Sequence, residues 1–170
     1  MKKSIRYCAL IFVAAFFQSC NSESNKYVYS DVSKFKKLIY VNKQIKGVKF
    51  EITDVLFTES RKIEKINDNP EDPYVIFAVI KLDSVSYKQL TEQVKSEPAI
   101  DNVLLTKKSL RTWFPKSIKE SISPKGRFFK FEKSVYNSHV LIKSNSYDGD
   151  FIFLDEDSIF LTLFSKRFRT

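Results

Sequence analysis

The chain has 170 residues, a length that fits one domain. Hydrophobic residues make up 43% and aromatic residues 15%, with 16 Phe against 3 Gly, which excludes an intrinsically disordered chain. The net charge is +9, of which three basic residues lie in the N-terminal leader, leaving +6. This excess is spread along the sequence, so it does not indicate a nucleic-acid-binding protein. It is compatible with anionic lipid or an acidic partner, although a solvated basic surface explains it more simply.

The N-terminal leader has the organisation of a signal peptide. It begins with basic residues, continues with an apolar run from Cys8 to Phe17 and ends in a small polar stretch. A membrane-spanning helix needs about 20 apolar residues, and this run has 10, so we do not expect a permanent anchor helix.

The end of the leader, Phe17-Gln18-Ser19-Cys20, resembles the lipobox of bacterial lipoproteins, in which a small residue precedes a modified cysteine. Ser19 and Cys20 match that pattern, whereas Phe17 and Gln18 depart from the usual Leu and small residue. The resemblance implies cleavage before Cys20, diacylglycerol on its sulfur and usually a further N-acyl chain. Two or more acyl chains anchor a protein stably to a membrane. A plainly cleaved secretory signal is the alternative.

These assignments divide the chain into a signal peptide (1–19), a polar tether (20–30) and one domain (31–170). Asn21 follows the cysteine, where an Asp favours inner-membrane retention in enterobacteria, so by analogy the outer membrane is favoured over the inner membrane. Cys8 leaves with the leader, and the mature chain therefore forms no intramolecular disulfide.

The first half of the domain contains four predicted elements. Asp31 is placed to cap a helix that runs to about Asn42. Residues 48–53 alternate apolar and polar and predict a half-buried strand, followed by a bulge or turn near Asp54. After the loop 67–73, Tyr74–Leu82 is apolar on both faces, which is typical of a central strand. A capping box formed by Ser86 and Gln89 predicts a helix that ends before Pro98.

The second half is expected to be rich in short strands. Val103–Leu105 predicts a short strand or a helical turn. Further strands are predicted over 128–135, 139–143, 150–154 and 159–164, the last two joined by a tight hairpin. The whole pattern predicts a two-layer α+β domain, an antiparallel sheet of about five to six strands with one to two helices on one face. In outline it resembles many small bacterial lipoproteins of unknown function.

Candidate catalytic and metal-binding residues are few. His139 is the only histidine, and a lone histidine on a strand is typical of a packed or surface residue. No G-x-S-x-G nucleophile elbow occurs, and zinc would need more His and Cys ligands. The acidic residues between Asp148 and Asp157 do not fit a calcium loop and are interpreted as turn residues at hairpin ends. Asp68, Glu71 and Asp72 are interpreted as solvated loop residues. We therefore predict no catalytic residue, no metal and no cofactor.

The segment Lys107–Lys119 is the candidate binding surface. It combines the only Trp with basic residues, and Trp and Arg are enriched at binding hot spots. The residues predicted to form this surface are Trp113, Arg111, Lys107, Lys108 and Lys116. The competing hypothesis places Trp113 inside the domain, covering the side of the sheet that carries no helix.

The expected function is that of a lipid-anchored envelope protein, a non-enzymatic binding or structural module. A periplasmic immunity or inhibitor protein that neutralises a toxin or enzyme is the first alternative, and an enzyme acting on envelope glycan or lipid is the second. The predicted partners are the membrane, through the lipid anchor, and a protein of the envelope. Nucleic acid is not expected, and the oligomeric state is not indicated.

Overall fold

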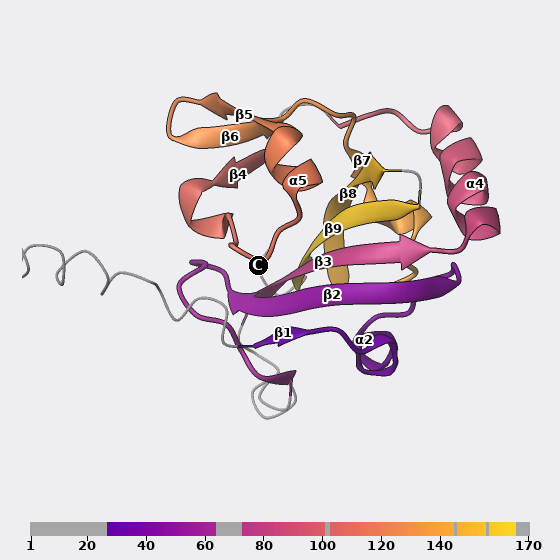
Figure 1. Ribbon diagram of the computed structural model, residues 1–170, viewed down its shortest axis with the longest axis horizontal. Coiled ribbons are helices and arrows are strands. Elements are labelled where there is room, and N and C mark those ends of the chain that lie inside the picture. Colours follow the sequence, from indigo (N-terminus) through magenta and orange to yellow (C-terminus); the bar gives the residue numbers. More distant parts are fainter. Residues whose placement is uncertain (1–26, 64–72, 101–102, 145, 156, 166–170) are drawn as a thin grey trace, which may run out of the picture.

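The domain is built on a six-stranded antiparallel sheet (Figure 1). The computed structural model describes residues 27–63, 73–100, 103–144, 146–155 and 157–165. In spatial order the strands are β1 (Val28–Tyr29), β2 (Ile45–Asp54), β3 (Tyr74–Leu82), β9 (Ser158–Ser165), β8 (Tyr147–Asp155) and β7 (Tyr136–Asn137). The predicted α+β class and the antiparallel sheet of five to six strands are confirmed.

Strand β3 lies inside the sheet, paired with β2 on one side and β9 on the other. Ile76 and Ile80 belong to the hydrophobic core on one face, and Val75 and Phe77 to the core on the opposite face; all four are fully buried. A strand buried on both faces reads as a continuous apolar run, and the prediction for Tyr74–Leu82 is confirmed at both ends.

One face of the sheet is covered by α2 (Val32–Leu38) and α4 (Ser84–Gln93). Asp31 caps α2 as predicted, and its carboxylate accepts hydrogen bonds from the N–H groups of Ser33 (2.8 Å) and Lys34 (3.1 Å). The helix ends at Leu38, earlier than predicted, because Ile39 is extended and buried and leads the chain back to the sheet.

The predicted capping box of α4 is wrong. Asp83 is the N-cap, and its carboxylate accepts hydrogen bonds from the N–H groups of Val85 (2.9 Å) and Ser86 (3.0 Å). Ser86 is instead buried inside the first turn, where its hydroxyl accepts a bond from the Gln44 N–H (3.0 Å). A short 3₁₀ turn, η2 (Val94–Ser96), ends the helix before Pro98, as predicted.

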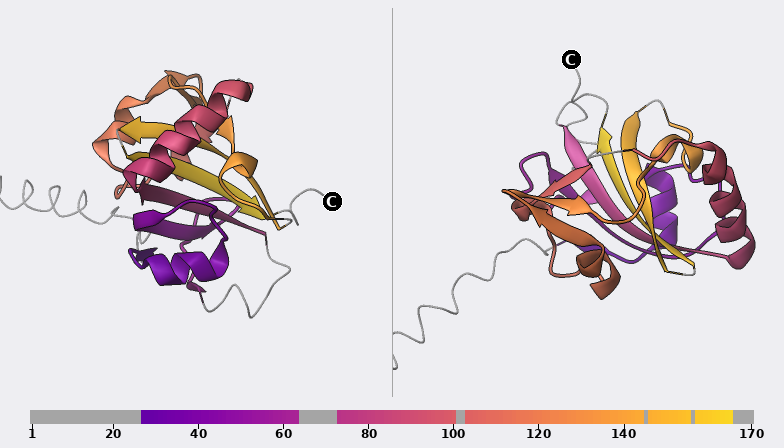
Figure 2. Two further views of the ribbon diagram at one scale, coloured as in Figure 1. Left: turned by 90° about the vertical axis from the view of Figure 1, so that its right-hand side faces the viewer. Right: turned by 90° about the horizontal axis from the view of Figure 1, so that it is seen from above.

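A second, three-stranded sheet covers the opposite face and was not predicted. Its order is β4 (Leu104–Thr106), β6 (Phe128–Phe131) and β5 (Ile122–Lys125), and it is accompanied by η3 (Lys107–Ser109) and α5 (Lys116–Glu120). The right-hand view of Figure 2 shows the large sheet between α2 and α4 on one side and this small sheet on the other. The second core, packed between the two sheets, is rich in phenylalanine: Phe77, Phe114, Phe131 and Phe160.

The C-terminal hairpin is confirmed, since β8 pairs with β9 as far as Asp155 and Ser158. The predicted strand 139–143 is wrong. Ser138–Val140 is a 3₁₀ turn, η4, because the Asn137 side chain accepts a hydrogen bond from the His139 N–H (3.0 Å) and closes the turn. The strand predicted over 128–135 stops at Phe131.

The domain begins earlier than predicted. Val28 and Tyr29 pair with Glu51 and Phe50 of β2, so the predicted tether includes residues that belong to the sheet. The signal peptide, Cys20 and the acidic residues Asp68, Glu71 and Asp72 lie outside the described residues. Within the described part of the chain, no helix has the length and apolarity needed to cross a membrane.

Candidate functional site

The polar face predicted for β2 is exposed at Lys49 but buried at Glu51 and Thr53. Val48, Phe50 and Ile52 face the helix layer, as predicted, but Glu51 and Thr53 face the small sheet and are 0% exposed. The small-sheet layer, through Arg111, covers them. Burial of a carboxylate without partners is very unfavourable, so the surroundings of Glu51 are informative.

Glu51 is the centre of a hydrogen-bond network supplied by its own chain. The Arg111 Nε donates to both carboxylate oxygens at 3.1 Å. The Trp113 indole N–H donates to Oε2 at 2.6 Å, and the Ser60 hydroxyl donates to Oε1. The carboxylate therefore has donors on both oxygens, which offsets part of the cost of its burial.

The other nitrogens of Arg111 also have partners. Nη2 donates to the Thr53 hydroxyl at 3.1 Å, and Nη1 donates to the carbonyl oxygens of Lys108 at 2.7 Å and Phe57 at 3.4 Å. The guanidinium group lies 5.8 Å from the centre of the Phe77 ring. Arg111 thus joins three separate parts of the chain: strand β2, the turn after it and the segment that carries Trp113.

The turn predicted near Asp54 is confirmed, and the Asp54 carboxylate holds it. Burial by itself raises the pKa of Asp54, but hydrogen bonds from the Thr58 hydroxyl and from the N–H groups of Thr58 (2.7 Å) and Glu59 (3.3 Å) lower it below its usual value. The ordered turn places the Phe57 carbonyl and the Ser60 hydroxyl at the Glu51–Arg111 pair.

The predicted binding surface is only partly at the surface. Arg111 is 3% exposed, so its assignment to an exposed surface is wrong: its charge is neutralised by Glu51 inside the domain. Trp113 is half-buried and packs edge-on against Phe114 with 4.8 Å between ring centres. Lys49 Nζ lies 5.6 Å from the Trp113 ring. These contacts fit the competing hypothesis, in which Trp113 covers the sheet.

The remaining members of that surface, Lys107, Lys108 and Lys116, are exposed. Lys116 pairs with Glu120 across one turn of α5 at 3.1 Å. The main chain of the segment is held from inside the domain, since the Lys108 carbonyl accepts a hydrogen bond from Arg111. The structure thus presents Lys107 and Lys108 on a rigid part of the small-sheet layer, without an aromatic anchor that projects into solvent.

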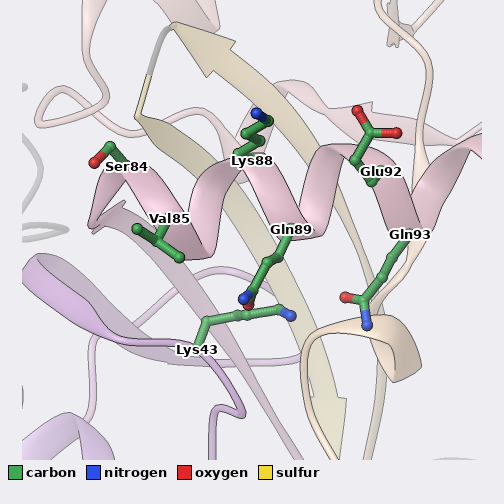
Figure 3. A pocket seen from close by; sticks show the side chains of 7 residues that line it. All are labelled: Lys43, Ser84, Val85, Lys88, Gln89, Glu92 and Gln93. Atoms are coloured by element: carbon green, nitrogen blue, oxygen red, sulfur yellow. The ribbon is translucent and has the colours of Figure 1, made fainter.

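A separate surface groove of about 570 Å³ lies along the outer side of α4. Figure 3 shows the Lys43 side chain running beneath the helix toward Gln89, and Lys88 and Glu92 on the upper side. The full lining is Lys43, Ser84, Val85, Lys88, Gln89, Glu92 and Gln93. Apart from Lys43, these residues are exposed, so the groove is an open, basic surface and not an enclosed cavity.

The other candidates do not come together. His139 is exposed, with its Nε2 3.5 Å from Glu97 Oε2. Asp148 and Asp150 lie within β8 and not at its turn, which corrects the interpretation of all these acids as turn residues. In the described ranges, no three His, Cys, Asp or Glu side chains gather as a metal site would require.

Comparison with known proteins adds no family to this description. No protein-family model, curated protein or solved structure matches the chain.

Proposed function

We propose that this chain is a lipid-anchored protein of the bacterial cell envelope whose domain acts by binding. The observation that carries the proposal is the leader, in which a basic start and an apolar run end at Ser19-Cys20. Six residues separate Cys20 from Tyr27, where the described domain begins. An acyl group on Cys20 would therefore hold the folded domain close to the membrane, with the outer membrane favoured.

The buried ion pair supports binding over catalysis. Glu51 and Arg111 are the buried acid–base pair of the described domain, and each side-chain nitrogen and carboxylate oxygen of the pair bonds to a group of the chain itself. A general acid or base must reach the proton of a substrate, either directly or through one water. The pair instead fixes the Lys107–Lys119 segment to the sheet, and rigid scaffolds that carry loops are typical of recognition domains.

Acylation is tested by metabolic labelling with an alkyne-bearing palmitate in a bacterial host, comparing Cys20→Ala with Cys8→Ala. Wild type and Cys8→Ala should incorporate the label and fractionate with membranes, because the modified sulfur belongs to Cys20. Cys20→Ala should remain unlabelled and uncleaved. Label in Cys20→Ala, or its absence from wild type, would refute the lipid anchor.

The residues that we propose for partner binding are Lys107, Lys108 and Lys116, which are exposed on the small-sheet layer. Envelope partners are captured by cross-linking in intact cells and compared between wild type and Lys107→Glu/Lys108→Glu. Loss of a specific acidic partner in the double variant, at unchanged thermal stability, supports this surface. An unchanged set of partners would place recognition elsewhere on the domain.

A further inference from the structure

The helix layer carries five lysines, on α2, on α4 and on the segment between α2 and β2. α2 buries Phe35 against the sheet, and Lys34, Lys36 and Lys37 on its other sides are exposed. Lys43 and Lys88 line the groove along α4. We call these five residues, Lys34, Lys36, Lys37, Lys43 and Lys88, the helix-layer lysines.

Three carboxylates lie near these lysines: Asp31 interacts with Lys34, Glu92 interacts with Lys88, and Asp83 lies at the start of α4. Asp31 and Asp83 cap the two helices. Glu92 pairs with Lys95 at 2.8 Å. Of the carboxylates that the structure describes, none lies within ion-pair distance of a helix-layer lysine. Five lysines against three carboxylates leave this surface with a net positive charge, which complements an anionic one.

Two exposed apolar side chains accompany the charge. Tyr40, which follows α2, is 68% exposed, and Val85 in the first turn of α4 is 63% exposed. Val85 lines the same groove as Lys43 and Lys88. Tyrosine is enriched where membrane and water meet, because its ring is apolar and its hydroxyl is polar.

The anchored end of the domain lies next to this surface. β1 enters α2 after only Ser30 and Asp31, and Lys34 Nζ lies 5.7 Å from the Tyr29 ring. Seven Cα–Cα steps join Cys20 to Tyr27, and seven residues of extended chain span at most about 25 Å. The tether is thus short compared with the domain and keeps α2 within reach of the headgroups.

From these observations we infer that the helix-layer lysines dock the domain on the anionic headgroups of the membrane in which Cys20 is anchored. The inference rests on the proposed function, since the acyl group on Cys20 is what keeps the domain near the bilayer. A basic residue near an anionic bilayer strengthens adsorption by about fivefold, and the tether makes the contact intramolecular. The occupant is therefore phosphate-bearing lipid at the bilayer surface.

The experiment uses the acylated protein purified from its host and reconstituted in vesicles of phosphatidylcholine alone or mixed with phosphatidylglycerol. A membrane-impermeant amine reagent labels lysines, and mass spectrometry reads each site. Lys36, Lys43 and Lys88 should be labelled severalfold more slowly on the anionic vesicles, whereas Lys107 and Lys108 on the small-sheet layer should not change. High salt should remove the protection, because it screens surface charge.

Matched charge reversals provide the control. Lys34→Glu/Lys37→Glu should abolish protection at Lys36, Lys43 and Lys88, whereas Lys107→Glu/Lys108→Glu, with the same change in net charge, should retain it. Equal labelling of both lysine groups on both vesicle types would overturn docking. So would protection in native envelopes but not in vesicles, which would assign the surface to a protein. A purified chain without acyl groups would instead overturn the proposed function before reconstitution.

Discussion

Replacing Arg111 with Met tests whether the Glu51–Arg111 pair holds the small-sheet layer against the large sheet. Methionine keeps a long, flexible apolar side chain in the same space but supplies no donor. The Glu51 carboxylate, which is 0% exposed, would retain only the Trp113 indole and the Ser60 hydroxyl. The carbonyl oxygens of Lys108 and Phe57 would lose their side-chain donor as well.

The expected loss is large because one charge remains buried. Removing one partner of a buried ion pair typically costs about 3–5 kcal/mol in the free energy of unfolding. For a domain of this length, that corresponds to a fall of about 6–20 °C in Tm. Circular dichroism reports Tm, and fluorescence of the single Trp follows the layer that carries Trp113.

A second substitution separates the charge effect from lost packing. Glu51→Gln removes the buried charge but keeps an oxygen that accepts the Trp113 N–H. Glu51→Gln/Arg111→Met should therefore be more stable than Arg111→Met alone, by about 1–2 kcal/mol in urea unfolding, a coupling typical of neighbouring residues. If the double variant loses as much free energy of unfolding as the two single variants together, or more, this account of the pair is refuted.

Three further predictions concern single sites. Trp113→Phe keeps the ring against Phe114 but removes the donor to Glu51 Oε2, and should lower the free energy of unfolding by about 1.5–3 kcal/mol in urea; an unchanged midpoint would mean that the bond contributes nothing. Gly149→Ala would place a Cβ 1.9 Å from the Thr162 carbonyl oxygen and should cost about 3 kcal/mol or more in thermal unfolding, whereas Gly47→Ala, with its nearest contact at 3.8 Å, should melt close to wild type. The pKa of Asp54 is lowered in the folded protein, so the stability that its carboxylate contributes is present above about pH 4, the pKa of Asp in the unfolded chain, and is lost as the pH falls through the lower pKa of the folded protein. Asp54→Asn should therefore reduce the loss of stability at acid pH, and an identical acid dependence of stability in both proteins would contradict this.

The parts of the fold that were predicted correctly have strong local signals. Tyr74–Leu82 is a long apolar run between turn residues, and the C-terminal hairpin has two apolar runs around acidic turn residues. Asp31 is a good N-cap before an amphipathic segment. In each case the nearest neighbours in the sequence determine the backbone, so periodicity and turn chemistry were sufficient.

The parts that were missed depend on contacts distant in the sequence. Glu51 alternates with apolar residues as a solvent-facing residue does, and only its partners, 60 and 62 residues further on, permit its burial. One signal was available: β3 is apolar on both faces, which requires a second layer over the sheet, and the neighbouring Glu51 must then lie beneath it. The strands of that layer are three to four residues long, too short for their periodicity to be recognised.

The two proposed surfaces lie on opposite faces of the large sheet, and this arrangement makes them compatible. Helices α2 and α4 cover one face, and the small sheet with Lys107 and Lys108 covers the other (Figure 2). A bilayer against the helix layer would leave the small-sheet layer directed away from the membrane, where an envelope partner can reach it. Docking would also fix the orientation of the domain on its short tether. The buried Glu51–Arg111 pair joins the Lys107–Lys119 segment to β2, and β2 pairs with β1, the strand nearest to Cys20 in the sequence. The pair would therefore hold that segment in a fixed position relative to a docked membrane.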